Sequence, residues 1–374
     1  MALETTALLP RFLRRIGITL LYVTLGALIL YSPKFAFFQQ DRVLNVCMFT
    51  ETLSYEAIEK FQQETGIKVN LTYVEIDAQT YAKFCINQCR DYDVMNLSDT
   101  YVYKLSKQGW LQEIDWSKVP NINRVYDVLK HRVYDPENCY VVPHKWYIYG
   151  IVYDRVFFNN MPPEQMSWEY ILKDPKILHQ QGLVSSPYRT CMVDDARDAA
   201  LVTAMYLFND IAHLDTAQME RVQQVMLAQK PWVEAYTLYS AQYFLFTKIV
   251  PIAAMTSNYM RRIYANSDRF EFAIPKEGSV LIIENMIIPK HSKNHDLAHQ
   301  FINFMLRDDI ARLNSKTFTY NSANQYANDY SDPRVLSNPH MFPDAKTFER
   351  LRVPFLSPEV PKLIEKCWLS VALA

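Results

Sequence analysis

The chain has 374 residues, enough for two or three domains of ordinary size. It carries 39 basic and 40 acidic residues, and no long block of one sign stands out, so bulk electrostatics gives no support for nucleic-acid binding. Hydrophobic residues make up 49% of the chain, which excludes disorder as its overall state, and the 7 glycines form no glycine-rich phosphate-binding loop.

The first residues have the pattern of an export signal. Arg11, Arg14 and Arg15 precede an uncharged run over 16–31, as in secretory leaders. This run is shorter than the roughly 20 residues that a membrane-spanning helix needs. We therefore expect residues 1–36 to be either a cleaved signal peptide or an uncleaved signal anchor, with the rest of the chain outside the inner membrane.

The chain contains six cysteines, and an oxidising compartment would permit disulfides. Cys85 and Cys89 are four residues apart, which would let them meet in a helix but equally allows two free thiols. The CxxC spacing typical of structural zinc sites does not occur, and the H-x₃-H spacings of His291, His295 and His299 have no cysteine pair near them in the sequence. We expect neither a metal nor a cofactor.

Strand and helix patterns alternate along the chain beyond Gln40. An apolar run over 43–49 predicts a strand. A helix is predicted over 55–65, because Ser54 can cap its start and Gly66 can end it. The same alternation then predicts these elements: strand 67–73, a helix around 81–85, strand 92–97, helix 101–108 and, after 191–193, helix 199–208. Such an order indicates an open α/β sheet.

Ligands of open α/β sheets bind beyond the carboxyl ends of the strands. In this chain those ends are followed by the short polar segments 49–52 and 98–100. We expect both segments to face a ligand.

A set of short blocks occurs in a fixed order along most of the chain. They are 61–69 (FQQETGIKV), 81–83 (YAK), 92–94 (YDV), 167–168 (SW), 194–197 (DDAR), 275–278 (PKEG), 302–307 (INFMLR) and 343–345 (PDA). In this order they resemble the spermidine/putrescine-binding proteins of polyamine ABC importers, a branch of the periplasmic solute-binding superfamily. The resemblance extends from about Leu44 to the mid-340s.

The resemblance implies an α/β, two-lobe periplasmic binding protein fold, in which each lobe is an open sheet flanked by helices. Hinge strands near 146–152 and 282–288 would join the lobes. Lobe 1 would comprise 43–147 and 283–328, and lobe 2 would comprise 148–282 and 329–374. The implied protein is a periplasmic, non-enzymatic carrier that binds a polyamine in the cleft and delivers it to an inner-membrane ABC permease.

Three acidic residues are candidates for holding ligand amines. Glu284 interrupts the apolar run 280–288, and a buried carboxylate needs a partner, which could be an internal ion pair or a ligand. Asp195 and Asp198 could equally be stabilising acids in a first helical turn. The resemblance places all three where the family has amine-binding acids.

The resemblance also implies a reduced aromatic cage. Non-cage residues stand where the family usually has Trp or Tyr, namely Phe49, Thr52, Thr100, Met255 and Ile282. Thr50 and Ser98 keep hydroxyls at family positions, and Asp99 adds an acid. Part of the wall could come from other tyrosines, for which the candidates are Tyr101, Tyr149 and Tyr259. Loss of cage contacts is expected to weaken amine binding and to change which amine is preferred.

Two other functions stay open at this point. A membrane-anchored interaction protein with a degenerate cleft would explain the missing cage, and a cleft filled by side chains would favour it. An enzyme of the same fold would need a nucleophile, for which Cys47 is the candidate, although spacing ties no His or acid to it.

Overall fold

The computed structural model describes residues 16–27, 42–75, 77–212, 214–327, 333–356 and 359–374. Residues 16–27 form a helix with exposed apolar side chains. Among the described helices, this one included, none combines the length and the apolar character needed to cross a membrane. The rest of the expected signal segment, 1–15 and 28–36, lies outside the described residues.

The first βαβ unit forms as the sequence predicts. Strand β1 (Val43–Phe49) leads into helix α2 (Tyr55–Thr65), and β2 (Lys68–Val74) then pairs with β1 in parallel, one residue later than expected. The Ser54 hydroxyl accepts the N–H of Ala57 at 3.2 Å, and Gly66 ends the helix with a φ of 68°. Local capping therefore fixes both ends of α2.

One half of the sheet has the strand order β2-β1-β3-β9. Leu44 and Met48 of β1 pack on the side of α2, whereas Cys47 and Phe49 pack on the side of α3 and α4. The further elements here are α3 (Asp77–Asn87), β3 (Val94–Ser98), α4 (Asp99–Lys107), β9 (Ser279–Ile287), α11 (His295–Met305), α12 (Asp308–Phe318) and β10 (Asn321–Ser322). We call this unit, together with β1, α2 and β2, the β1 half.

The other half, which we call the β7 half, continues the order as β7-β5-β6, and β8 pairs with β4. Its strands are β5 (Thr190–Met192), β6 (Val233–Tyr236), β7 (Ile252–Thr256) and β8 (Phe270–Ala273). Its helices are α5 (Glu169–Leu172), α6 (Pro175–Gln180), α7 (Ala196–Phe208), α8 (Thr216–Gln229), α9 (Ala241–Phe246), α10 (Ser257–Asn266), α13 (Pro333–Ser337) and α15 (Val360–Leu373). Helix α7 begins three residues before its expected start, because Asp195 caps it.

Smaller elements complete the described chain. They are α14 (Ala345–Phe348), β11 (Leu351–Arg352) and the 3-10 helices η1 (Trp116–Lys118), η2 (Pro120–Arg124), η3 (Asp127–Leu129), η4 (Pro163–Gln165) and η5 (Lys230–Trp232).

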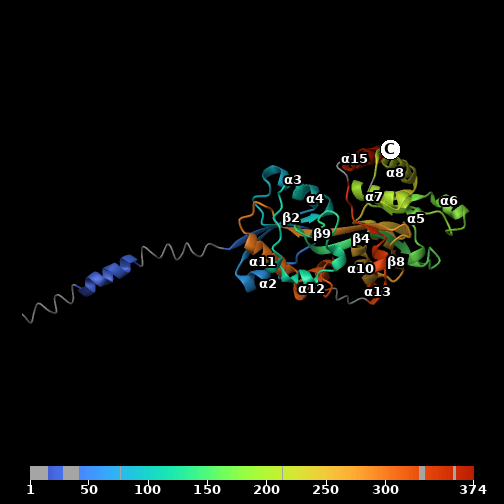
Figure 1. The fold of residues 1–374 in the computed structure, drawn as a ribbon. Helices are drawn as coiled ribbons and strands as arrows, with labels where there is room; N and C mark the ends of the chain where they lie inside the picture. The colour runs from blue at the N-terminus through green and yellow to red at the C-terminus, as the bar shows by residue number, and fades with distance from the viewer. Residues whose placement is uncertain (1–15, 28–41, 76, 213, 328–332, 357–358) are drawn as a thin grey trace, which may run out of the picture.

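The long strand β4 (Val142–Asp154) joins the two halves. Its residues 142–148 pair with β9, and its residues 149–153 pair with β7, so the strand leaves one sheet and enters the other. Figure 1 shows the two bodies, with α2, α3 and α11 in one, α7 and α8 in the other, and β4 between them. This is the two-lobe α/β architecture with crossing strands that the sequence predicts.

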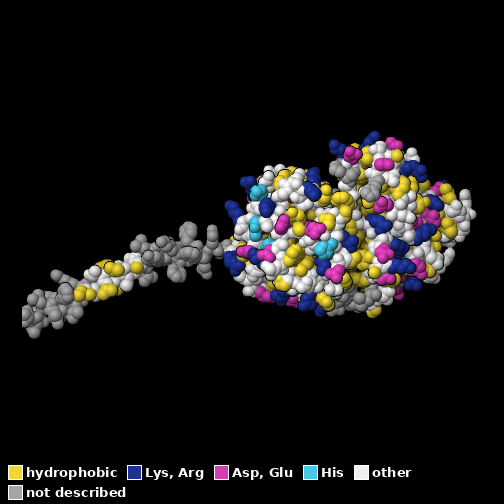
Figure 2. Space-filling view, in the orientation of Figure 1, with side chains coloured by type: hydrophobic (Ala, Val, Ile, Leu, Met, Phe, Trp, Pro, Cys, Tyr) yellow, Lys and Arg dark blue, Asp and Glu magenta, His cyan; other side chains and the backbone are white. Residues whose placement is uncertain are grey.

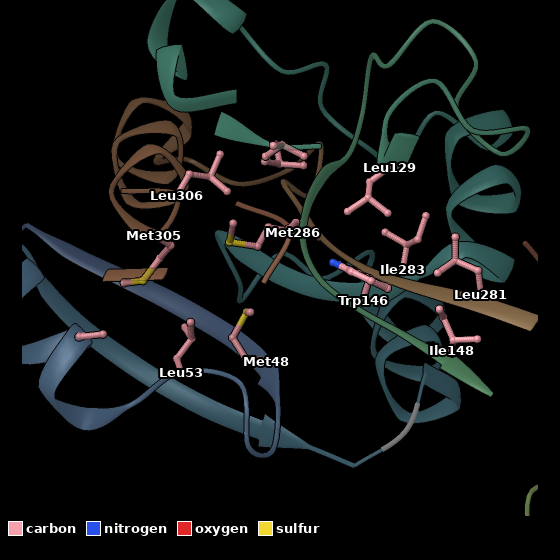
Figure 3. Close-up of a cluster of buried hydrophobic side chains, with 14 of the residues drawn as sticks. Met48, Leu53, Leu129, Trp146, Ile148, Leu281, Ile283, Met286, Met305 and Leu306 are labelled. Atoms are coloured by element: carbon pink, nitrogen blue, oxygen red, sulfur yellow. The ribbon is translucent and has the colours of Figure 1, made fainter. Parts of the chain in front are cut away.

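Apolar side chains fill the region where β4 and β9 run together. Trp146 and Ile148 of β4 lie against Leu281 and Ile283 of β9, and all four are at most 2% exposed (Figure 3). The same buried cluster extends to Met305 and the neighbouring residues of α11. The crossing strands are thus part of a continuous core.

All six cysteines are free thiols. Helix α3 ends at Asn87, and Gln88 and Cys89 adopt positive φ values of 56° and 53°. The helical four-residue spacing is therefore lost, and Cys85 is exposed while Cys89 is buried. Of the two possibilities left open, the structure has the free thiols.

Candidate ligand-binding site

A cavity of about 770 Å³ lies between the two halves, at the carboxyl ends of β1, β3, β5, β6 and β7. Its size is within the range of small-molecule sites, roughly 300–1,000 Å³. The strand ends are the location expected for an open α/β sheet. On the outer surface, Figure 2 shows acidic and basic side chains interspersed across the visible face, without a large patch of one sign.

Three helices begin at this cavity. The N-cap residues of α4, α7 and α10 are Ser98, Asp195 and Thr256, and all three line it. The Asp195 carboxylate accepts the backbone N–H of Asp198 at 3.0 Å. Asp195 therefore serves as a helix cap and lines the cavity at the same time.

Six of the residues expected at the site line the cavity: Phe49, Thr50, Ser98, Asp195, Asp198 and Glu284. Four others do not: Thr52, Asp99, Met255 and Ile282. All four are fully buried, and the two apolar side chains belong to the hydrophobic core of their strands β7 and β9. Thr100 belongs to α4, and its side chain lies outside the described part of the structure.

Glu284 is buried beside a lysine. Its side chain is 5% exposed, and the Lys145 ammonium lies 3.1 Å from Oε1. The Asn96 amide donates to Oε2 at 3.0 Å. Lys145 and Glu284 face each other in the register of β4 and β9. The sequence allows either an internal ion pair or a ligand as the partner of Glu284, and in the structure the partner is Lys145.

Asp198 also has partners within the protein. The Tyr149 hydroxyl donates to one of its oxygens, and Arg197 Nε lies 3.0 Å from the other. Arg197 reaches in addition to Asp99 of the β1 half, at 3.9 Å. Burial raises the pKa of Asp198, although Arg197 opposes this shift. Neither Glu284 nor Asp198 is therefore a carboxylate without a cation of its own.

The cavity nevertheless has more acids than bases. Its acidic lining residues are Glu51, Glu75, Asp194, Asp195, Asp198 and Glu284, and its basic ones are Lys145, Arg197 and Arg262. Each base is paired with an acid, since Arg262 lies 3.3 Å from Glu51. Glu75, Asp194 and Asp195 are exposed and make no ion pair within the described residues. Three carboxylates are thus left over to face the cavity.

The aromatic wall is richer than the sequence suggests. Eight aromatic residues line the cavity: Phe49, Tyr101, Tyr147, Tyr149, Tyr239, Tyr259, Phe318 and Tyr320. Of these rings only Phe49 stands at a position where the family usually has Trp or Tyr, so the aromatic wall comes almost entirely from other positions. Tyr101, Tyr149 and Tyr259 are the three that we named as candidates.

Tyr239 and Tyr259 form an aromatic pair in the cavity wall. Their rings meet edge to face, with centroids 6.2 Å apart. Burial raises the pKa of Tyr239, and the carboxylates of Glu51, Asp194, Glu75 and Glu284 raise it further. Sequence reasoning missed Tyr239, although it follows the carboxyl end of β6 and the rule applied to 49–52 would have found it.

The other candidate chemistry has less support in the geometry. Cys47 is fully buried in β1 and does not line the cavity. Burial raises the pKa of its thiol to about 11, the opposite of what a thiolate nucleophile needs. The described residues contain no cluster of three or more His, Cys, Asp or Glu side chains arranged to hold a metal.

Known proteins of similar sequence are named as spermidine- or putrescine-binding proteins. The spermidine/putrescine-binding periplasmic protein of Salmonella typhimurium is 27% identical over 303 residues, which cover 81% of this chain and 83% of that protein. The putrescine-binding periplasmic protein SpuD of Pseudomonas aeruginosa is 25% identical over 378 residues, covering 96% and 99% of the two chains.

Solved structures share the fold. The spermidine/putrescine ABC transporter substrate-binding protein PotD from Streptococcus pneumoniae superposes with a TM-score of 0.74 at 22% identity, covering 89% of this chain and 99% of its own. A putative spermidine/putrescine ABC transporter protein from Listeria monocytogenes gives the same TM-score at 24% identity and the same coverage. The sequence model for bacterial extracellular solute-binding proteins matches residues 56–343. With that match over most of its length, the chain belongs to the bacterial extracellular solute-binding protein family.

Proposed function

We propose that this protein is the periplasmic solute-binding component of an ABC importer and that it binds an amine of the spermidine/putrescine class in the cavity between its halves. Its relatives in Salmonella typhimurium and Pseudomonas aeruginosa carry the names of polyamine-binding periplasmic proteins. Its partner would be an inner-membrane permease that receives the ligand from the closed form. The role is binding and delivery, without catalysis.

The observation that carries this proposal is the surplus of carboxylates beside aromatic rings. Asp194, Asp195 and Glu75 line the cavity and make no ion pair within the part of the chain that the structure describes, and Tyr239 and Tyr259 line the same cavity. A hydrogen bond to a charged group contributes about 1.5–3 kcal/mol, and a cation over an aromatic ring about 0.5–2 kcal/mol. A few such contacts together approach the roughly 8 kcal/mol of a micromolar complex.

Titration calorimetry with putrescine, spermidine and spermine tests the proposal. We expect at least one of these amines to bind, and we expect Asp194→Asn to weaken that binding about tenfold, since it removes one charge-assisted contact. Asp127→Asn is the matched control, because this exposed carboxylate is not among the lining residues.

The two variants change the net charge equally, so only a local contact can separate them. Absence of binding heat and of a thermal shift with every amine would refute the proposed function. That result would favour the interaction protein with a degenerate cleft, for which the resident cations Lys145 and Arg197 are the structural argument.

A further inference from the structure

One ammonium group inside the cavity belongs to the protein itself. Lys145 Nζ lies 3.1 Å from the Glu284 carboxylate and 5.2 Å from the centroid of the Tyr320 ring. A carboxylate on one side and an aromatic face on another are the contacts by which a protein holds an alkylammonium guest. Lys145 makes both contacts from within the site.

The fold holds this side chain in place. Lys145 and Glu284 are directly opposed on neighbouring strands, and their side chains are only 10% and 5% exposed. If the ammonium moved away, Glu284 would remain as a buried carboxylate without a cation, which is strongly unfavourable. The Asn96 amide on Oε2 is neutral and could not replace the lost charge. The pair is therefore expected to persist when a ligand enters.

We propose that Lys145 is a specificity-determining residue: its ammonium occupies the position at which a ligand amine would otherwise meet Glu284, and the cavity consequently favours linear aliphatic diamines over triamines. The inference rests on the proposed function: among the amines of the spermidine/putrescine class, it names diamines as the preferred ligands. A diamine can use two of the acids Asp194, Asp195 and Glu75, which make no ion pair within the described residues. A third ammonium that extends along the cavity toward Glu284 would meet the like charge of Lys145.

Removal of the lysine charge gives the direct test. Binding of putrescine and spermidine is measured by calorimetry for the wild type, for Lys145→Met, and for the double variant Lys145→Met/Glu284→Gln. We expect the wild type to prefer putrescine. Lys145→Met frees a buried carboxylate for a ligand ammonium, so the ratio of spermidine to putrescine affinity should rise about tenfold or more. The double variant lacks that carboxylate and should lose the gain.

The outcomes separate this inference from the proposed function. If amines bind but the wild type prefers spermidine, or if folded Lys145→Met keeps the wild-type ratio, the inference is overturned and the proposed function stands. If no amine binds the folded wild type or either folded variant, both fall.

A crystal structure of the wild type with putrescine provides a second test that needs no variant. We expect Lys145 Nζ to remain on Glu284 and the ligand nitrogens to lie on other carboxylates. A ligand nitrogen bonded to Glu284 in place of Lys145 would overturn the inference, even if the methionine variant failed to fold.

Discussion

His144 shows how strongly burial shifts the protonation of a single side chain in this protein. It precedes Lys145 on β4 and is only 7% exposed. Burial lowers the pKa of His144 to about 3, and the neighbouring Lys145 charge lowers it as well. The folded protein therefore keeps this imidazole neutral at pH values where the unfolded chain, with a pKa near 6.5, takes up a proton. Such a buried, neutral residue has a structural role.

This difference predicts a loss of stability in acid. Because the unfolded state binds the extra proton below pH 6.5, the contribution of His144 is complete above that pH and is lost as the pH falls toward 3. Between pH 7.5 and 5 the wild type should lose about 2 kcal/mol more than His144→Leu in urea unfolding. The exposed His291→Leu should follow the wild type. Parallel pH profiles for the wild type and His144→Leu would contradict the prediction.

The candidate site was only partly predictable at the level of residues. Phe49 and Ser98 are the last residues of β1 and β3, and their position along the chain was enough to expect them at the site, whereas the expectation for Asp195 came from the resemblance. Lys145 was missed because its opposition to Glu284 comes from a pairing between strands more than a hundred residues apart, and no local pattern reports such a register. The resemblance implied that Met255 and Ile282 belong to the site, but their apolar side chains are buried in the core and do not line the cavity.

At the level of elements, β4 leaves the least room for changes in side-chain size, because it is paired on both sides along much of its length. Gly150 lies where the strand passes from β9 to β7, opposite Met255. A Cβ atom at this position would lie 2.5 Å from Phe272 Cζ and 2.6 Å from the Ala273 carbonyl oxygen. The crossing therefore requires a residue without a side chain, for steric reasons and not for backbone freedom.

We expect Gly150→Ala to destabilise the protein by about 1–3 kcal/mol, the usual cost of overpacking a filled core. Urea unfolding measures this cost. Phe272→Leu should relieve part of the clash, so the double variant should be more stable than the sum of the two single changes predicts. Strict additivity would show that the Phe272 ring is not the obstacle.

Short-range signals explain why the early elements were predicted well. Helix α2 has its cap at Ser54 and its end at Gly66 within the chain itself. Helix α4, in contrast, begins at Asp99, two residues earlier than predicted, directly after the last residue of β3. The pairing of β3 with β9 fixes that junction, and a sequence window over 92–108 does not contain β9.

For the whole molecule, contacts that cross the cavity are expected to influence how far the two halves open. Arg262 of α10, in the β7 half, lies 3.3 Å from Glu51 and donates to the Thr319 hydroxyl at 3.2 Å, both in the β1 half. The paired side chains are 38% and 55% exposed, so the ion pair contributes at most about 1 kcal/mol. A contact of this size can bias an equilibrium between open and closed forms without locking it.

Arg262→Met should therefore open the ligand-free protein without preventing closure. Small-angle X-ray scattering is expected to give a larger radius of gyration for the ligand-free variant than for the ligand-free wild type. With a saturating amine the two should agree, since ligand contacts then hold the halves together. Amine affinity should fall by no more than about fivefold, because the lost pair contributes at most about 1 kcal/mol.

A control variant separates the effect of losing an ion pair between the halves from the effect of losing an arginine anywhere in the protein. Arg124 pairs with Asp308 at 2.9 Å with similar exposure, but this pair stays within one half, since η2 packs against α11 of the β1 half and Asp308 is the first residue of α12. Arg124→Met should leave the radius of gyration unchanged with and without ligand. If it expanded the protein as much as Arg262→Met, or if neither variant differed from the wild type, closure would not depend on the contact between α10 and Glu51. The halves would then be held by β4, β9 and the other contacts between them, such as those of Arg197 with Asp99 and of Arg261 with Asn321.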